Sequence, residues 1–130
     1  MLSKERVWEM FQKTYFDSID SGRMEEAASI FHEEVEWIHT QVWEHDDYRR
    51  SKGSDRLQGR KQVEALLSER RESMARAGIR HLVKDVVFDG EKGALIGTVR
   101  GPGKDMPFIA WFEIREGKVS RYIVAPLYIP

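Results

Sequence analysis

The sequence contains no cysteine, and this absence excludes several kinds of site at once. There is no disulfide framework, no thiolate zinc centre, no iron–sulfur cluster and no cysteine nucleophile. No apolar run approaches the ~20 residues that cross a bilayer. The first ten residues, MLSKERVWEM, lack the apolar core of a signal peptide. We therefore expect a cytoplasmic protein without a membrane span.

An excess of charge of one sign is missing as well. The chain has 21 Lys and Arg against 22 Asp and Glu, a net charge of −1, which gives little long-range attraction to nucleic acid. The charges are segregated, with ten acids and one base in residues 17–47 and eleven bases and four acids in residues 49–84. Such blocks form a patch that binds nucleic acid or an acidic ligand, or they neutralise each other within or between subunits. We favour neutralisation.

The 130 residues contain no repeat and no linker, which predicts a single domain over residues 1–130. A first helix is expected over residues 3–19, with Ser3 as its N-cap and Gly22 ending it. Its buried stripe repeats every four residues: Val7, Phe11, Tyr15 and Ile19. A second, short helix is indicated by apolar residues at helical spacing: Met24, Ala27, Ala28 and Phe31. A third is expected over residues 60–76, ended by Gly78, with four buried residues: Val63, Leu66, Leu67 and Met74.

The strands are predicted from side chains that alternate along the chain and from the turn residues between them. The first strand is predicted where Val35, Trp37 and His39 alternate with Glu36, Ile38 and Thr40. Four more strands are expected over residues 81–88, 94–100, 106–114 and 119–127, and residues 41–58 are expected to form a long loop over a pocket mouth. The order α-α-β-α-β-β-β-β predicts an α+β domain with an antiparallel meander. With the helices on its concave side, a curved sheet of this kind encloses a cavity.

The content of large rings is high for so small a core. Such rings line small-molecule pockets, but they also fill cores, and composition alone favours the core. They are Trp8, Trp37, Trp43, Trp111, Tyr15, Tyr122, Phe108 and Phe112.

Four stretches carry a resemblance to a known family: YFDSIDSG, MEEAASIFHEEVEWIHT, GRKQVEALL and PFIAWFEIREGKVSRYIV. With the order of elements, they resemble the nuclear transport factor 2-like superfamily, which includes ketosteroid isomerases, SnoaL-like polyketide cyclases, scytalone dehydratase and limonene epoxide hydrolase. The resemblance covers nearly the whole chain. It implies a cone-shaped, cystatin-like fold with a SnoaL-like or ketosteroid isomerase-like domain. It fixes no activity, because this fold hosts many chemistries.

The resemblance to ketosteroid isomerases can be followed residue by residue. Their phenol, seven residues before the glycine that ends the first helix, corresponds to Tyr15. Their carboxylate base, eight residues after the phenylalanine that we place in the second helix, corresponds to His39. Their protonated acid, two residues before a strand phenylalanine, corresponds to Ala110. The phenol is kept, the base is changed and the acid is lost, so we do not expect a standard steroid isomerase.

His39 and Tyr15 are the candidate catalytic residues. In an apolar cavity a neutral imidazole can accept a proton, and Asp46 or Asp47 could fix its tautomer. The Tyr15 hydroxyl could donate to a substrate carbonyl and stabilise an enolate. Each residue also has a structural interpretation: His39 as a buried or strand-end histidine, and Tyr15 as part of the core stripe. Tyr122 could add a second hydroxyl.

Three functional hypotheses follow. The first is a cofactor-free isomerase, cyclase or dehydratase that removes a proton next to the carbonyl of a small hydrophobic substrate. The second is a pocket that binds a hydrophobic ligand without changing it, and the third is a dimerisation domain with a filled cone. The expected pocket residues are Phe11, Val35, Trp37, Leu67, Phe108, Ala110, Phe112 and Tyr122.

We expect no metal and no cofactor. His32, His39, His45 and His81 form no HxH or HExxH motif, and residues 101–103 read as a hairpin turn between strands and not as a phosphate loop. If the even positions of the strand over 106–114 face the cavity, three residues are expected on the outer face: Ile109, Trp111 and Ile123. A patch of that kind predicts a homodimer. The tail, residues 127–130, could close the pocket or join the dimer.

Overall fold

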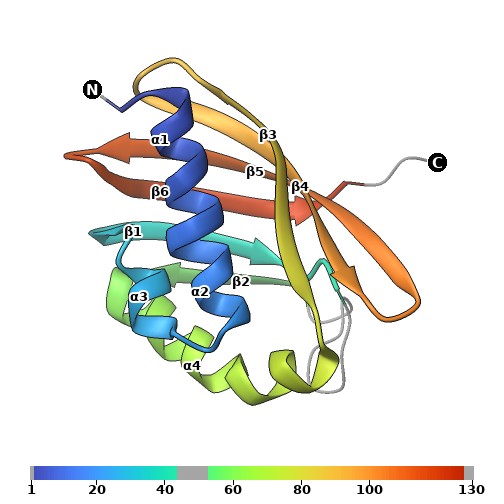
Figure 1. Cartoon of the computed structure of the whole chain (residues 1–130). Coiled ribbons are helices and arrows are strands. Elements are labelled where there is room, and N and C mark those ends of the chain that lie inside the picture. Colours follow the sequence, from blue (N-terminus) through green and yellow to red (C-terminus); the bar gives the residue numbers. More distant parts are fainter. Residues whose placement is uncertain (1, 44–52, 128–130) are drawn as a thin grey trace.

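The computed structural model describes residues 2–43 and 53–127 (Figure 1). Its helical segments are α1 (Lys4–Glu9), a π-helical stretch (Met10–Phe16), α2 (Asp17–Asp20), α3 (Met24–Ala28) and α4 (Arg60–Ala77). Its strands are β1 (Phe31–Thr40), β2 (Ser54–Gln58), β3 (Arg80–Phe88), β4 (Lys92–Gly101), β5 (Lys104–Arg115) and β6 (Lys118–Pro126). None of the helices in these ranges is long and apolar enough to span a membrane.

One six-stranded sheet forms the body of the protein, in the order β2-β1-β6-β5-β4-β3. Strands β3 to β6 form the antiparallel meander that the turn signals predict, and β1 joins β6 in parallel. In Figure 1 the sheet curves around the first helical segment, with α3 and α4 closing the lower end. The result is the α+β architecture with helices on the concave side that the sequence predicts.

Two sequence-based boundaries are wrong. Residues 54–58 are not loop, because β2 pairs with β1 and sets Leu57 opposite Trp37. This edge strand carries mostly polar residues, so it has no strong alternation to reveal it. Phe31 does not end the second helix: α3 stops at Ala28, and Phe31 begins β1, buried opposite Val119 of β6. A helical spacing of four apolar residues cannot tell a helix end from the first buried residue of a strand.

The first helix is not uniform. It begins at the predicted cap, where the Ser3 side chain accepts from the Arg6 N–H at 3.1 Å. It then widens into the π-helical stretch before α2. The predicted stripe is buried throughout, and Phe11 packs between Phe112 and Tyr122 at ring distances of 4.8 and 5.9 Å. The stripe thus holds the helix inside the curve of the sheet.

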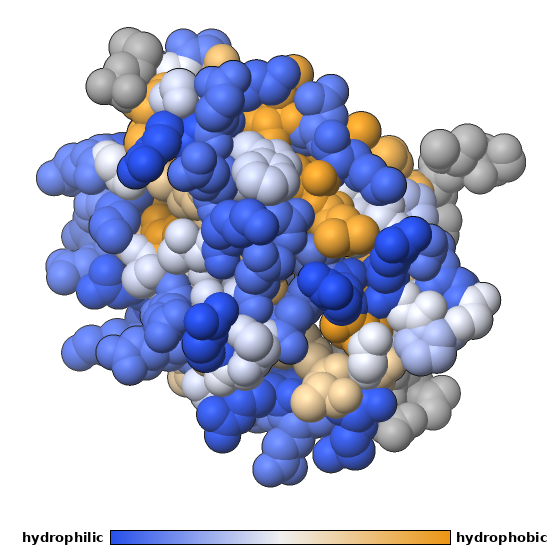
Figure 2. Space-filling view, in the orientation of Figure 1, coloured by the Kyte–Doolittle hydropathy of each residue, from blue (hydrophilic) through white to orange (hydrophobic). Residues whose placement is uncertain are grey.

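The two faces of the sheet differ as predicted. Phe108, Ala110 and Phe112 point inward and are buried, whereas Ile109 and Trp111 are each 39% exposed on the outer face. Register places Trp111 opposite Ile123 on β6. Figure 2 shows mainly hydrophilic residues over the helical face of the molecule.

The acidic segment (residues 17–47) and the basic segment (residues 49–84) form ion pairs both between them and within each of them. Arg60, from the basic segment, lies 3.7 Å from Glu33 of the acidic segment. Other pairs stay within one segment, such as Arg23 with Glu26 at 3.6 Å and Arg70 with Asp55 at 2.5 Å.

Candidate functional site

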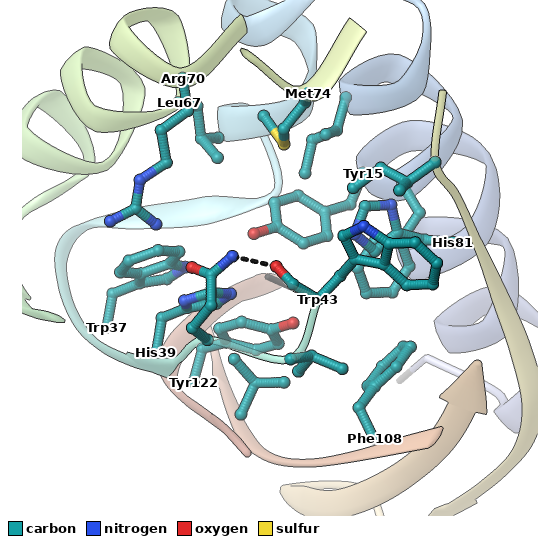
Figure 3. A pocket seen from close by; sticks show the side chains of 16 residues that line it. Tyr15, Trp37, His39, Trp43, Leu67, Arg70, Met74, His81, Phe108 and Tyr122 are labelled. Atoms are coloured by element: carbon teal, nitrogen blue, oxygen red, sulfur yellow. Dashed lines mark hydrogen bonds between the residues drawn. The ribbon is translucent and has the colours of Figure 1, made fainter. Parts of the chain in front are cut away.

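A cavity of about 60 Å³ lies inside the curve of the sheet, between the first helix, α4 and strands β1, β3, β5 and β6. Figure 3 shows Tyr15 and Tyr122 reaching into the same space from opposite sides. Four of the expected pocket residues line it, namely Trp37, Leu67, Phe108 and Tyr122. The other four lie in the core beside it: Phe11, Val35, Ala110 and Phe112.

The two phenols form the centre of the polar wall. Tyr15 and Tyr122 are almost fully buried, with their rings edge to face at 5.7 Å. Burial raises the pKa of both above the ordinary value of 10.0. The interaction between the two hydroxyls lowers the pKa of Tyr15 and raises that of Tyr122. Both phenols line the cavity, and a neutral phenol can donate its O–H proton to a ligand.

Trp37 supplies a buried donor at the same place. Its side chain is 1% exposed, and its indole N–H lies near the Tyr15 oxygen and lowers the pKa of that phenol. Within residues 2–43 and 53–127 the Nε1 atom is buried and has no hydrogen-bond partner. Buried indole N–H groups usually find a partner. An acceptor atom of a ligand would satisfy this one.

His39 lies in the cavity wall, with its ring stacked on Trp37 at 5.1 Å. Burial first, and then the positive charge of Arg70, lower its pKa from 6.5 to about 3, whereas the charge of Asp55 opposes the shift. Its Nδ1 atom is buried and has no hydrogen-bond partner in the described ranges. The ring is therefore neutral at pH 7, as the sequence suggested, but it is a weak base. Asp46 and Asp47, its suggested partners, lie outside the described residues.

Arg70 places a positive charge beside His39 and Tyr15. Helix α4 carries it inward, where it is 6% exposed and lines the cavity. Asp55, on β2 opposite His39, pairs with it at 2.5 Å. The sequence analysis missed this pair, because it predicts a loop over residues 41–58 and expects the basic segment that contains Arg70 to be neutralised by the acidic segment, residues 17–47. A long charged side chain at a buried helical position, in register with Val63 and Leu67, was the available signal.

His81 is the second group that the sequence analysis missed, apart from its inclusion among possible metal ligands. It lines the cavity from β3, stacked on Phe16 at 5.0 Å. Its Nδ1 atom and the Asp20 carboxylate are 2.7 Å apart, and its backbone N–H donates to the other oxygen of Asp20 at 2.8 Å. Because Nδ1 is held by a carboxylate, Nε2 is the nitrogen that can accept a proton from a ligand. The two residues are 61 positions apart, so no local motif marks the pair.

Gln12 ties the helix to the same strand. Its amide nitrogen donates to the His81 carbonyl and to Asp17, both at 3.0 Å, and its oxygen accepts from the Val83 N–H at 2.7 Å. The side chain is buried. Gln12 and Asp20 together fix the backbone on both sides of the His81 ring.

The part of the chain that the structure describes has no cluster of three or more His, Cys, Asp or Glu side chains that could hold a metal. The arrangement offers instead a histidine–carboxylate pair, two phenols and a buried guanidinium around one small space. These groups can accept a proton and stabilise negative charge on an oxygen.

Comparison with known proteins fits this architecture. The model of the SnoaL-like domain matches residues 13–122, so the chain belongs to the family of SnoaL-like domain proteins. No curated protein matches the chain.

Solved structures share the nuclear transport factor 2-like fold. A candidate ketosteroid isomerase from Kribbella flavida superposes with a TM-score of 0.67 at 19% identity, covering 98% of this chain and 83% of that one. A candidate polyketide cyclase from Sinorhizobium meliloti gives 0.66 at 17% identity, covering 95% and 100%. A nuclear transport factor 2-like protein of unknown function from Burkholderia xenovorans gives 0.66 at 15% identity, covering 98% and 90%. At these identities the likeness concerns the fold.

Proposed function

We propose that the cavity binds a small hydrophobic carbonyl compound and removes a proton from the carbon next to its carbonyl group, without a cofactor. The observation that carries the proposal is the convergence of a carboxylate-held histidine and a phenol on one largely apolar cavity. Isomerisation, dehydration and ring closure all begin with this step. The likeness to structures described as candidate ketosteroid isomerases and polyketide cyclases is consistent with it.

His81 is the proposed base. The C–H bond breaks, its proton passes to Nε2, and its electron pair moves into the enolate, leaving negative charge on the substrate oxygen. Asp20 orients the ring and stabilises the imidazolium that forms. A base works best when its pKa lies near the working pH. His39, with a pKa lowered to about 3, suits that role less well, and we assign it a hydrogen-bonding role toward the substrate.

Tyr15 is the proposed donor to the enolate oxygen. It lines the cavity, and its raised pKa keeps the hydroxyl protonated, so its proton is available for a hydrogen bond to the substrate. The nearby Trp37 N–H and the Arg70 guanidinium favour negative charge at the same point. A single well-placed donor in a dry site is worth roughly 3 kcal/mol.

The test is α-proton exchange of 2-tetralone in D₂O, followed by NMR. His81→Gln and Tyr15→Phe should each reduce the enzymatic exchange rate by at least tenfold, and His39→Gln should reduce it less than His81→Gln does. His32→Gln, on β1 but outside the cavity lining, is the matched control and should leave the rate unchanged. Wild-type exchange no faster than buffer, or equal rates in all variants, would remove the proposal.

A binding protein without turnover is the second candidate. The observation in its favour is the low pKa of His39, which leaves the position that corresponds to the isomerase base without a strong base. In that case a compound that binds in the cavity is recovered unchanged, with no deuterium incorporated, after long incubation with wild-type protein.

A further inference from the structure

The cavity is smaller than the ligand that the proposed function needs. Ligand pockets commonly have volumes of roughly 300–1,000 Å³, and this one has about 60 Å³. A substrate with a hydrophobic body must therefore extend beyond it. The part of the substrate that does not fit in the cavity must lie against a neighbouring surface.

A groove of about 450 Å³ lies directly outside the cavity, between α2 and the second half of α4. Three residues line both spaces, Ile19, Met74 and Ile79, so the wall between them is one side chain thick. Ile19 and Ile79 are buried, whereas Met74 is partly exposed on α4. Figure 3 shows Met74 at the edge of the cavity, between α4 and Tyr15. An unbranched methionine moves readily among rotamers, which makes it the part of the wall that can yield.

The proposed base lies at this junction. The His81 ring lines the cavity, and Asp20, the carboxylate that holds it, lines the groove. A molecule that passes Met74 from the groove would bring the end that enters the cavity close to His81. The phenol of Tyr15 lies further inside.

The lining of the groove combines apolar residues with balanced charges. Its apolar residues are Ile19, Met74, Ala75 and Ile79. Arg71, whose stem packs against Gly22, and Glu72 carry opposite charges, while the Asp20 carboxylate is engaged by His81. Figure 2 shows apolar atoms at the surface in this region, where α4 ends and β3 begins. Such a groove suits a neutral, apolar chain or ring.

We propose that this groove is the outer half of the substrate site: the substrate is an elongated carbonyl compound whose carbonyl end enters the cavity past Met74 and whose neutral, apolar tail lies between α2 and α4. This inference rests on the proposed function for the identity of the carbonyl end. The binding of the tail does not depend on the proposed function and requires only that the groove binds apolar chains.

Two methyl ketones that differ only in tail length test it, 2-butanone and 2-octanone. Each buried CH₂ group strengthens binding about fourfold, so 2-octanone should bind at least tenfold more tightly than 2-butanone, as measured by NMR titration. Ala75→Trp, which fills the groove, should abolish most of that difference and leave the Kd of 2-butanone unchanged. Ser68→Trp, exposed on the same helix but outside the groove, is the matched control and should keep the difference.

The two proposals fail in different ways. Equal Kd values for the two ketones, or a difference that Ala75→Trp leaves intact, would overturn the groove inference whether or not exchange is catalysed. Tighter binding of 2-octanone that depends on Ala75, without α-proton exchange, would support the groove and refute the proposed chemistry. Thermal unfolding of Ala75→Trp at the wild-type temperature shows that the fold is kept.

Discussion

Asp20 holds His81 through two hydrogen bonds, one from the backbone N–H at 2.8 Å and one with the ring Nδ1 at 2.7 Å. A carboxylate that accepts from both backbone and ring fixes the position of the residue and the tautomer of its imidazole together. Both side chains are largely buried, which limits competition from water.

Asp20→Asn should therefore lower catalysed exchange without unfolding the protein. An amide can still accept from the backbone N–H, but it carries no charge to stabilise an imidazolium and can favour the wrong tautomer. We expect a loss of at least tenfold in the 2-tetralone exchange rate. Asp17→Asn is the control, since Asp17 accepts from Gln12 and does not touch His81; a similar loss there would point to a general effect on the helix.

Gln12→Ala should destabilise the protein by roughly 2–4 kcal/mol, because it leaves the Val83 N–H and the His81 carbonyl without their partner in a buried region. Urea unfolding measures the change. Gln62→Ala removes a comparable but exposed contact to the Gln58 N–H and should cost less than about 1 kcal/mol. Equal losses would show that Gln12 does not brace β3.

The low pKa of His39 predicts a pH dependence of stability. The unfolded chain binds a proton near pH 6.5, and the folded chain does so only near pH 3, so the unfolded state holds more protons between these values. This contribution to stability is present above pH 6.5 and is lost as the pH falls toward 3, with a slope of at most about 1.4 kcal/mol per pH unit. Urea unfolding at pH 7 and pH 5 should show a smaller loss for His39→Phe than for wild type. Equal losses of stability in wild type and His39→Phe would contradict the lowered pKa of His39.

Trp43 rests on Gly101, where an added Cβ would lie 2.4 Å from the indole ring. Gly101→Ala should displace the indole and destabilise the fold by roughly 1–3 kcal/mol. In a Trp43→Ala background the same substitution should cost less, since the clash is gone. Additive losses in the double variant would mean that the two residues do not interact.

The outer face of the sheet leads us to propose a homodimer. Ile109 and Trp111 are half-exposed apolar residues on adjacent positions of that face, and Ile123 lies opposite Trp111. Light scattering should give twice the chain mass for wild type and the chain mass for Trp111→Lys. Thr14→Lys, on the exposed side of the first helix, is the control and should stay dimeric. A wild-type monomer at micromolar concentration would refute the proposal.

The sequence predicts those parts of the fold that local patterns encode. Alternation and glycine turns place β3 to β6, and the four-residue stripe orients the first helix so that Tyr15 lies inside the sheet with His39. Contacts between distant polar residues leave no such pattern. His81 is 61 positions from Asp20, so that pair could not be predicted before the fold was known. The helical register of Arg70 indicates that it faces inward, but it does not indicate Asp55 as its partner. The polar strand β2 and the buried start of β1 at Phe31 were missed because propensity and spacing are ambiguous there.

The last strand of the sheet order, β3, has a free edge that could pair with any extended chain. At His81 and Val83 that edge is occupied by the side chains of Gln12 and Asp20, which take the places a neighbouring strand would use. Gln12 and Asp20, which hold the proposed base in position, therefore also block the pairing of another strand with β3. Substitutions at these two residues should increase aggregation as well as reduce turnover.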